Sequence, residues 1–91
     1  MPLHEATFQI INQLGLHARA AAQLVRIANS YPCNVHLSCE GETVNAKSIM
    51  GVLMLAVAKG MHIHLSCEGE GAESCLREVG LLIANRFGEP R

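Results

Sequence analysis

The chain has 91 residues, of which 49% are apolar, and its formal net charge is −1. This length suffices for one small domain, so we expect residues 1–91 to form a single domain. The charge balance and the content of only 3% aromatic residues argue against nucleic-acid binding, which depends on basic and stacking side chains. No apolar run approaches the roughly 20 residues of a membrane-spanning helix, and the basic and apolar segments of a signal peptide are missing. We therefore expect a cytosolic protein that binds neither nucleic acid nor a membrane.

The four cysteines form no familiar redox or zinc motif, because none of them occurs in a C-x-x-C pair. In the reducing cytosol they should stay thiols, and free cysteines are usually buried. We expect four buried, unpaired cysteines, which are Cys33, Cys39, Cys67 and Cys75.

The first part of the chain predicts a strand, a turn and a helix. Apolar and polar residues alternate over residues 3–11, which indicates a half-buried strand. Residues 12–15 are typical of a turn, and the Ala-rich residues 18–30 have the apolar spacing of a helix that ends before Pro32. The residues expected to face inward in these elements are Ala6, Phe8, Ile10, Ala21, Leu24, Val25 and Ala28.

The remainder predicts three further strands, over residues 33–39, 43–46 and 61–67, and two further helices, over residues 49–58 and 72–87. The element order is therefore βαββαβα, and each strand has one apolar and one polar face. This pattern predicts an α+β fold in which helices cover one face of a sheet and the other face is open. The residues expected to face inward are Val35, Leu37, Cys39, Ile63, Leu65, Cys67, Leu76, Val79, Phe87 and either Leu82 or Ile83.

The most informative segment is NQLGLHARAAA at residues 12–22, where a glycine-containing loop leads to His17 at the start of the Ala-rich helix. The start of a helix has free backbone N–H groups and a partial positive charge, which together bind anions such as phosphate. The same positive end disfavours a protonated ring, so His17 should be neutral and nucleophilic. Arg19 lies in the first turn, where its guanidinium can bind two phosphate oxygens. A plainer interpretation makes His17 a polar N-cap and Arg19 a solvated surface charge.

The stretch GLHARAAA resembles the active site of the histidine-containing phosphocarrier protein (HPr) family, part of the bacterial phosphoenolpyruvate-dependent phosphotransferase system. VNAKSIMGVLMLAVAKG, at residues 44–60, resembles the second signature of this family, and the resemblance covers nearly the whole chain. It implies an open-faced β-sandwich, with a four-stranded antiparallel sheet and three helices on one face. It also implies a monomeric phosphocarrier that needs no cofactor.

The resemblance assigns roles to individual residues. His17 would be phosphorylated on Nδ1, as pros-phosphohistidine; Arg19 would stabilise the phosphoryl group; and the helix start at Ala18 and Arg19 would bind phosphate. Enzyme I would be the donor and an enzyme IIA domain the acceptor, in sugar uptake or in a nitrogen-type regulatory branch. The chain would then be a stoichiometric carrier and not an enzyme. Ala20 stands where the family usually has proline, from which we expect a looser first turn at a cost of about 1 kcal/mol or less.

Ser48 directly precedes the apolar run of residues 49–58, which we expect Gly60 to end, and it is a plausible N-cap for that helix. The resemblance adds a second role, because a dedicated kinase phosphorylates this serine in part of the family. A phosphate at a helix N-terminus would be tolerated by the fold but would disturb the docking of partners.

Some of this apolar run must belong to the core, and Val52 and Leu55 are the best candidates by periodicity. The resemblance assigns Ile49, Met50 and Leu53 to a docking face beside the active histidine. An exposed apolar patch with an adaptable methionine suits a carrier that meets several partners. Burial in the core remains the alternative for each of these three residues.

Three histidines, His36, His62 and His64, fall on outward strand positions, where they could form a zinc or copper set. Solvated surface histidines are far commoner, so we expect no metal site. The alternative function from a different class is a small cytosolic metal-binding or trafficking module.

Overall fold

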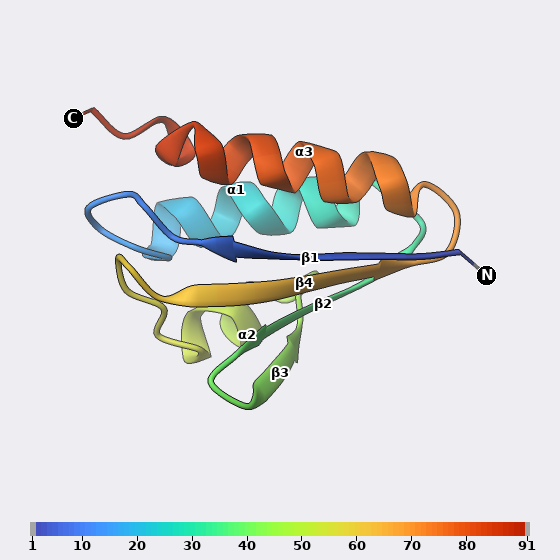
Figure 1. Ribbon diagram of the computed structural model, residues 1–91, viewed down its shortest axis with the longest axis horizontal. Coiled ribbons are helices and arrows are strands. Elements are labelled where there is room, and N and C mark those ends of the chain that lie inside the picture. The colour runs from blue at the N-terminus through green and yellow to red at the C-terminus, as the bar shows by residue number, and fades with distance from the viewer. Residues whose placement is uncertain (1, 91) are drawn as a thin grey trace.

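The computed structural model of the chain describes residues 2–90 and is shown in Figure 1. The expected domain spans residues 1–91, so its first and last residues lie outside the described part. The elements follow the predicted order and are β1 (Leu3–Gln9), α1 (Ala18–Asn29), β2 (Asn34–Cys39), β3 (Glu42–Asn45), α2 (Ile49–Met54), β4 (His62–Glu68), α3 (Ala72–Ala84) and a short 3₁₀ helix (Arg86–Gly88).

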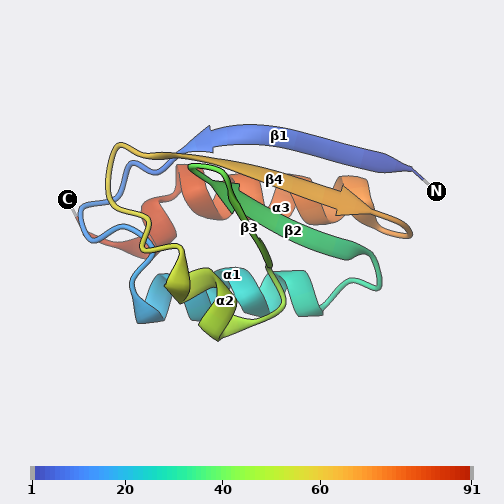
Figure 2. The same cartoon turned by 90° about the horizontal axis from the view of Figure 1, so that it is seen from below.

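The four strands form one antiparallel sheet in the order β1-β4-β2-β3. β4 lies between β1 and β2, where Leu65 is paired with Ala6 on one side and with Leu37 on the other. Figure 2 shows the three helices together on one side of this sheet, with α1 and α2 next to each other. The α+β open-faced sandwich is therefore confirmed.

The core lies between the sheet and the helices, and the alternating patterns predict its strand residues correctly. Ala6 and Phe8 are half-buried, and a Cβ built on Gly80 of α3 would lie only 3.1 Å from the Phe8 ring, so α3 and β1 are closely packed. Of the residues expected on α3, Val79 and Ile83 are buried and Leu76 and Leu82 are half-buried. The other predicted inward residues that are buried are Ile10, Ala21, Leu24, Ala28, Val35, Leu37, Ile63, Leu65 and the cysteines Cys33, Cys39, Cys67 and Cys75, all of which are free thiols.

Over the range 2–90, the structure contains no helix with the length and apolar character needed to cross a membrane.

The helix expected over residues 49–58 is wrong in length, because α2 ends at Met54. Ala56 has a φ of 52°, in the left-handed region, so the helix cannot continue through it. Val57 is then buried, and its carbonyl oxygen accepts a hydrogen bond of 2.9 Å from the N–H of Leu16. The apolar run has no residue that stops a helix before Gly60, and a contact with a distant loop ends it instead.

The helix expected over residues 72–87 is also too long, because α3 ends at Ala84. Arg86 and Phe87 have φ values of 58° and 53°, which turn the chain out of the helix. Phe87 is nevertheless buried. Because its side chain is apolar, the helical spacing in the sequence extends to this residue. The C-terminal segment ends at the same end of the molecule as the loop before α1 (Figure 1).

Candidate functional site

A tight turn leads from β1 to the start of α1. The N–H of Gly15 donates to the carbonyl of Asn12 at 3.3 Å, and Asn12 Nδ2 donates to the carbonyl of Gly15 at 2.9 Å. Gly15 has a φ of 64°, and a Cβ there would lie 2.4 Å from the carbonyl oxygen of Val57, so only glycine fits. The hydrogen bond from Leu16 to the same carbonyl joins the turn to the segment after α2. The backbone before His17 is thus fixed by contacts within the turn and across the fold.

His17 is the N-cap residue of α1 and has an extended backbone, with φ −71° and ψ 177°, but its side chain makes no capping hydrogen bond. The first helical bond runs from the N–H of Ala21 to the carbonyl of His17 at 2.8 Å, so the turn closes although Ala20 replaces proline. The N–H groups of Ala18, Arg19 and Ala20 precede this bond and have no acceptor inside the helix. The helix start therefore has N–H groups without helical acceptors, and the ring of His17 is not used for capping.

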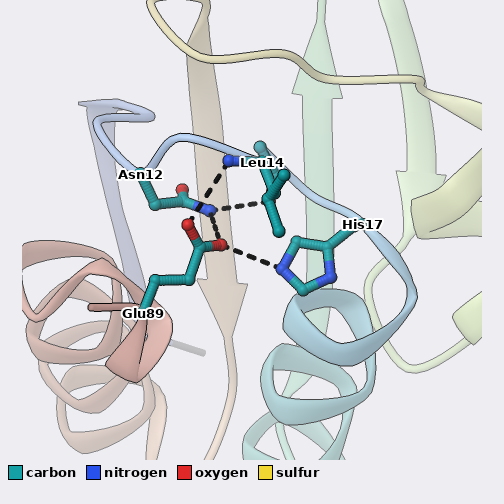
Figure 3. Close-up of polar contacts among 5 residues, drawn as sticks. Asn12, Leu14, His17 and Glu89 are labelled. Atoms are coloured by element: carbon teal, nitrogen blue, oxygen red, sulfur yellow. Dashed lines mark hydrogen bonds and ion pairs between the residues drawn. The ribbon is translucent and has the colours of Figure 1, made fainter. Parts of the chain in front are cut away.

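The ring of His17 is bound by Glu89, from the C-terminal segment (Figure 3). His17 Nε2 lies 2.9 Å from Glu89 Oε2, which also accepts a hydrogen bond of 2.6 Å from Asn12 Nδ2. The other carboxylate oxygen, Oε1, accepts from the N–H of Leu14 at 3.3 Å. We call this set of residues, Asn12, Leu14, His17 and Glu89, the Glu89 clasp.

Hydrogen bonding in the clasp lowers the pKa of Glu89 below its usual value. The bond from Asn12 contributes most; desolvation opposes it, and the bonds from His17 and Leu14 add to it. Glu89 is therefore a carboxylate at neutral pH. Asn12 is fully buried, and its Oδ1 has no hydrogen-bond partner among the described residues. An unpaired buried acceptor costs roughly 1–3 kcal/mol. The two hydrogen bonds that Nδ2 donates hold the side chain in place despite this cost.

A pocket of about 360 Å³ lies between the start of α1 and the C-terminal segment. Arg19 is exposed at this pocket, and within residues 2–90 it forms no ion pair with a carboxylate. The structure thus brings together the two residues, His17 and Arg19, that the sequence predicts as the reactive pair. The residues that line the pocket are Leu14, His17, Arg19, Phe87, Gly88, Glu89 and Pro90.

Ser48 is the N-cap of α2, as predicted. Its Oγ accepts a hydrogen bond of 3.1 Å from the N–H of Gly51, and the residue is exposed. Of the two core candidates in this segment, Val52 is fully buried and Leu55 is half-buried.

The predicted docking residues differ in their exposure. Ile49 and Met50 are 40% and 65% exposed, whereas Leu53 is half-buried against the core. Met54, at the end of the same helix, is 74% exposed and was missed by the sequence analysis. Leu14, in the loop before His17, is 66% exposed. Apolar side chains are therefore exposed both on α2 and in the site loop.

The histidines at outward strand positions either contact other side chains of the chain or lie apart from one another. His64 Nε2 lies 2.6 Å from Glu5 Oε1, and its Nδ1 lies 3.2 Å from Thr7 Oγ1. His36 is paired with Ser66 and is not directly opposite His64. In the part of the chain that the structure describes, no three His, Cys, Asp or Glu side chains are placed to hold a metal ion.

The sequence analysis missed the two residues that complete the site, Asn12 and Glu89. Asn12 carries a local signal, because an asparagine that opens a glycine turn often bonds to the backbone. Glu89 carries none, since it lies 72 residues from His17 and beyond the expected end of the last helix.

Comparison with known proteins identifies the family. The family described as "PTS HPr component phosphorylation site" matches residues 4–85. A phosphocarrier protein HPr from Pseudomonas aeruginosa is 51% identical over 90 residues, which is 98% of each chain. One from Cupriavidus necator is 48% identical over 80 residues, which is 88% of this chain and 90% of that one.

Among solved structures, the crystal structure of HPr-C-His from Thermoanaerobacter tengcongensis has a TM-score of 0.93 and 39% identity, and the match covers 97% of this chain and 99% of that chain. Both signatures noted in the sequence lie within the matched residues, and the order and packing of the elements agree. The chain therefore belongs to the HPr family of phosphocarrier proteins of the phosphotransferase system.

Proposed function

We propose that His17 accepts a phosphoryl group on Nδ1 from enzyme I and passes it to enzyme IIA-type acceptors of the phosphoenolpyruvate-dependent phosphotransferase system. The observation that carries this proposal is that His17 and Arg19 line one pocket at the start of α1, where the first N–H groups have no acceptor inside the helix. Arg19 and the helix start favour a negatively charged group beside His17, whose imidazole is the nucleophile.

The charges at the pocket suit phosphoryl transfer, in which negative charge is spread over the oxygens of the transferred group. Arg19 and the start of α1 supply positive charge, and within residues 2–90 Arg19 has no carboxylate partner to leave when the group arrives. The negative charge of Glu89, which lines the same pocket, is already engaged by hydrogen bonds within the clasp. Because the phosphorylated His17 must react again with an acceptor, the chain acts as a stoichiometric carrier and not as an enzyme.

The docking face of the proposal consists of Ile49, Met50 and Leu53, with which enzyme I and the acceptors would make contact. The exposed Met50 can adapt to partners of different shape. Phosphorylation of Ser48 by a serine kinase would regulate this step, since an added phosphate at the exposed N-cap borders the same face. We expect a cytosolic monomer, which serves either sugar uptake or the nitrogen-type regulatory branch according to its IIA acceptor.

The test is incubation of the chain with phosphoenolpyruvate and enzyme I, followed by intact mass measurement. The wild type should gain one phosphoryl group, and His17→Ala should gain none. Matched alanine variants of the other histidines, His4, His36, His62 and His64, should be labelled like the wild type. Labelling that survives His17→Ala would contradict the proposal. A zinc-dependent rise of the thermal midpoint that is lost in His64→Ala would instead favour the metal-binding alternative.

A further inference from the structure

The Glu89 clasp determines which nitrogen of His17 carries a proton. An ionised carboxylate can only accept hydrogen bonds, and Glu89 Oε2 lies 2.9 Å from His17 Nε2. The contact therefore requires a hydrogen on Nε2. A neutral imidazole has one N–H, so Nδ1 then keeps its lone pair. Figure 3 shows the second ring nitrogen on the side of the ring that faces away from Glu89.

We propose that Glu89 is a positioning residue for phosphoryl transfer: it holds His17 as the Nε2–H tautomer, with Nδ1 free to attack, and it balances the charge of the ring after attack. This inference rests on the proposed phosphorylation of His17. It assigns a role to a residue that lies outside residues 4–85, which the family model matches.

The charge balance follows from the transfer step. The lone pair of Nδ1 forms the new N–P bond, and the electron pair of the broken bond to phosphorus stays with the donor. The proton on Nε2 does not move, so the phosphorylated ring carries a positive charge beside the carboxylate of Glu89. When the group moves on to an acceptor, the N–P bond breaks and the ring leaves as neutral imidazole. Without the Nε2 proton it would leave as imidazolate, which is a far poorer leaving group.

The backbone that brings Glu89 to the ring is unfavourable in itself. Arg86 and Phe87 are consecutive non-glycine residues with φ values of 58° and 53°, a region that L residues rarely adopt. Strained backbone of this kind is concentrated at functional sites. Asn12 supports the arrangement from the other side, because its Nδ2 bonds to Glu89 while its own Oδ1 is buried with no partner among residues 2–90.

The test combines a spectroscopic and a kinetic measurement. Nitrogen-15 NMR of the wild type should show that the neutral His17 ring has its proton on Nε2 and not on Nδ1. Glu89→Gln keeps the size of the side chain but carries no charge, and its amide cannot accept from all three donors of the clasp. In this variant the ring should populate both tautomers. The rates of His17 labelling by enzyme I and of onward transfer should both fall about tenfold, the lower end of the loss seen when a residue that orients a metal-bound histidine is removed.

The matched control is Glu78→Gln, which removes a carboxylate that accepts from Tyr31 at the opposite end of α1. This variant should keep wild-type rates and wild-type His17 signals. Wild-type rates and signals in Glu89→Gln would overturn the inference and leave the proposed function intact. A neutral wild-type ring with its proton on Nδ1 would overturn it as well, and this measurement does not depend on the folding of any variant. If wild-type His17 is never labelled, the proposed function fails, whatever tautomer the spectrum shows.

Discussion

Replacing Gly15 with alanine tests whether close packing at Val57 fixes the loop that carries His17. The added Cβ would lie 2.4 Å from the carbonyl oxygen of Val57 and 3.0 Å from Cα of Ala58, both of which are backbone atoms that cannot rotate away. Alanine at a φ of 64° costs roughly 1–2 kcal/mol. Displacement of the loop would weaken the hydrogen bond from Leu16, which contributes about 1 kcal/mol. The reduced freedom of the unfolded chain offsets roughly 0.4–1 kcal/mol.

The expected net loss is about 2 kcal/mol, which lowers the thermal midpoint of a domain of this size by roughly 8–16 °C. Gly41 is a matched control, because it also has a positive φ, of 86°, but no atom lies within 4 Å of its Cβ position. Gly41→Ala should therefore lose only the conformational part. Both midpoints can be measured by circular dichroism, and His17 labelling should be slowed only in Gly15→Ala. Equal losses in the two variants would refute the view that contact with Val57, rather than φ alone, requires glycine.

Three further experiments test the docking face, the Glu89 clasp and the burial of the cysteines. Ser48→Asp should keep its thermal midpoint, because aspartate is also a good N-cap, but it should slow His17 labelling, because the charge borders the apolar docking face; unchanged labelling would remove Ser48 from that face. The folded-state pKa of Glu89 is below its ordinary value of 4.5, so the clasp stabilises the fold above that pH and its contribution is lost as the pH falls through the folded-state value. Glu89→Gln should therefore have a shallower decrease of thermal midpoint between neutral and acid pH than the wild type has, and identical curves would contradict the clasp. Burial raises the pKa of the Cys33 and Cys39 thiols, so the folded chain should react with iodoacetamide much more slowly than the unfolded chain, as mass measurement would show.

The sequence was sufficient to predict the strands because alternation of apolar and polar residues depends only on which face is buried. Val35, Leu37 and Cys39 show this directly, since all three are buried on one face of β2. Helix ends were predicted less well. An apolar run such as residues 49–58 can be helical or extended, and the hydrogen bond between Leu16 and Val57 decides where the helix stops. This bond joins residues that are far apart in the chain, so no local pattern contains it.

The candidate site likewise combines residues that a local pattern predicts with a residue that only a distant contact places. His17, Arg19 and Ser48 were predicted because each one stands at the start of a helix, where a short sequence determines the chemistry of the free N–H groups. Glu89 could not be predicted, because its position depends on left-handed φ values at two non-glycine residues after α3. Only the folded chain brings this carboxylate to the loop that precedes α1.

Ala20 departs from the family pattern in the first turn of α1. Proline would fix φ and remove an N–H that has no helical partner in any case. Here the first turn closes through the 2.8 Å bond between Ala21 and His17, and the Ala20 side chain is fully buried. Alanine also retains an N–H in the same turn as those of Ala18 and Arg19, so the helix start offers one more donor to an anion than it would with proline. The ring of His17 also contacts Glu89, so the first turn is not the only part of the described structure that positions it.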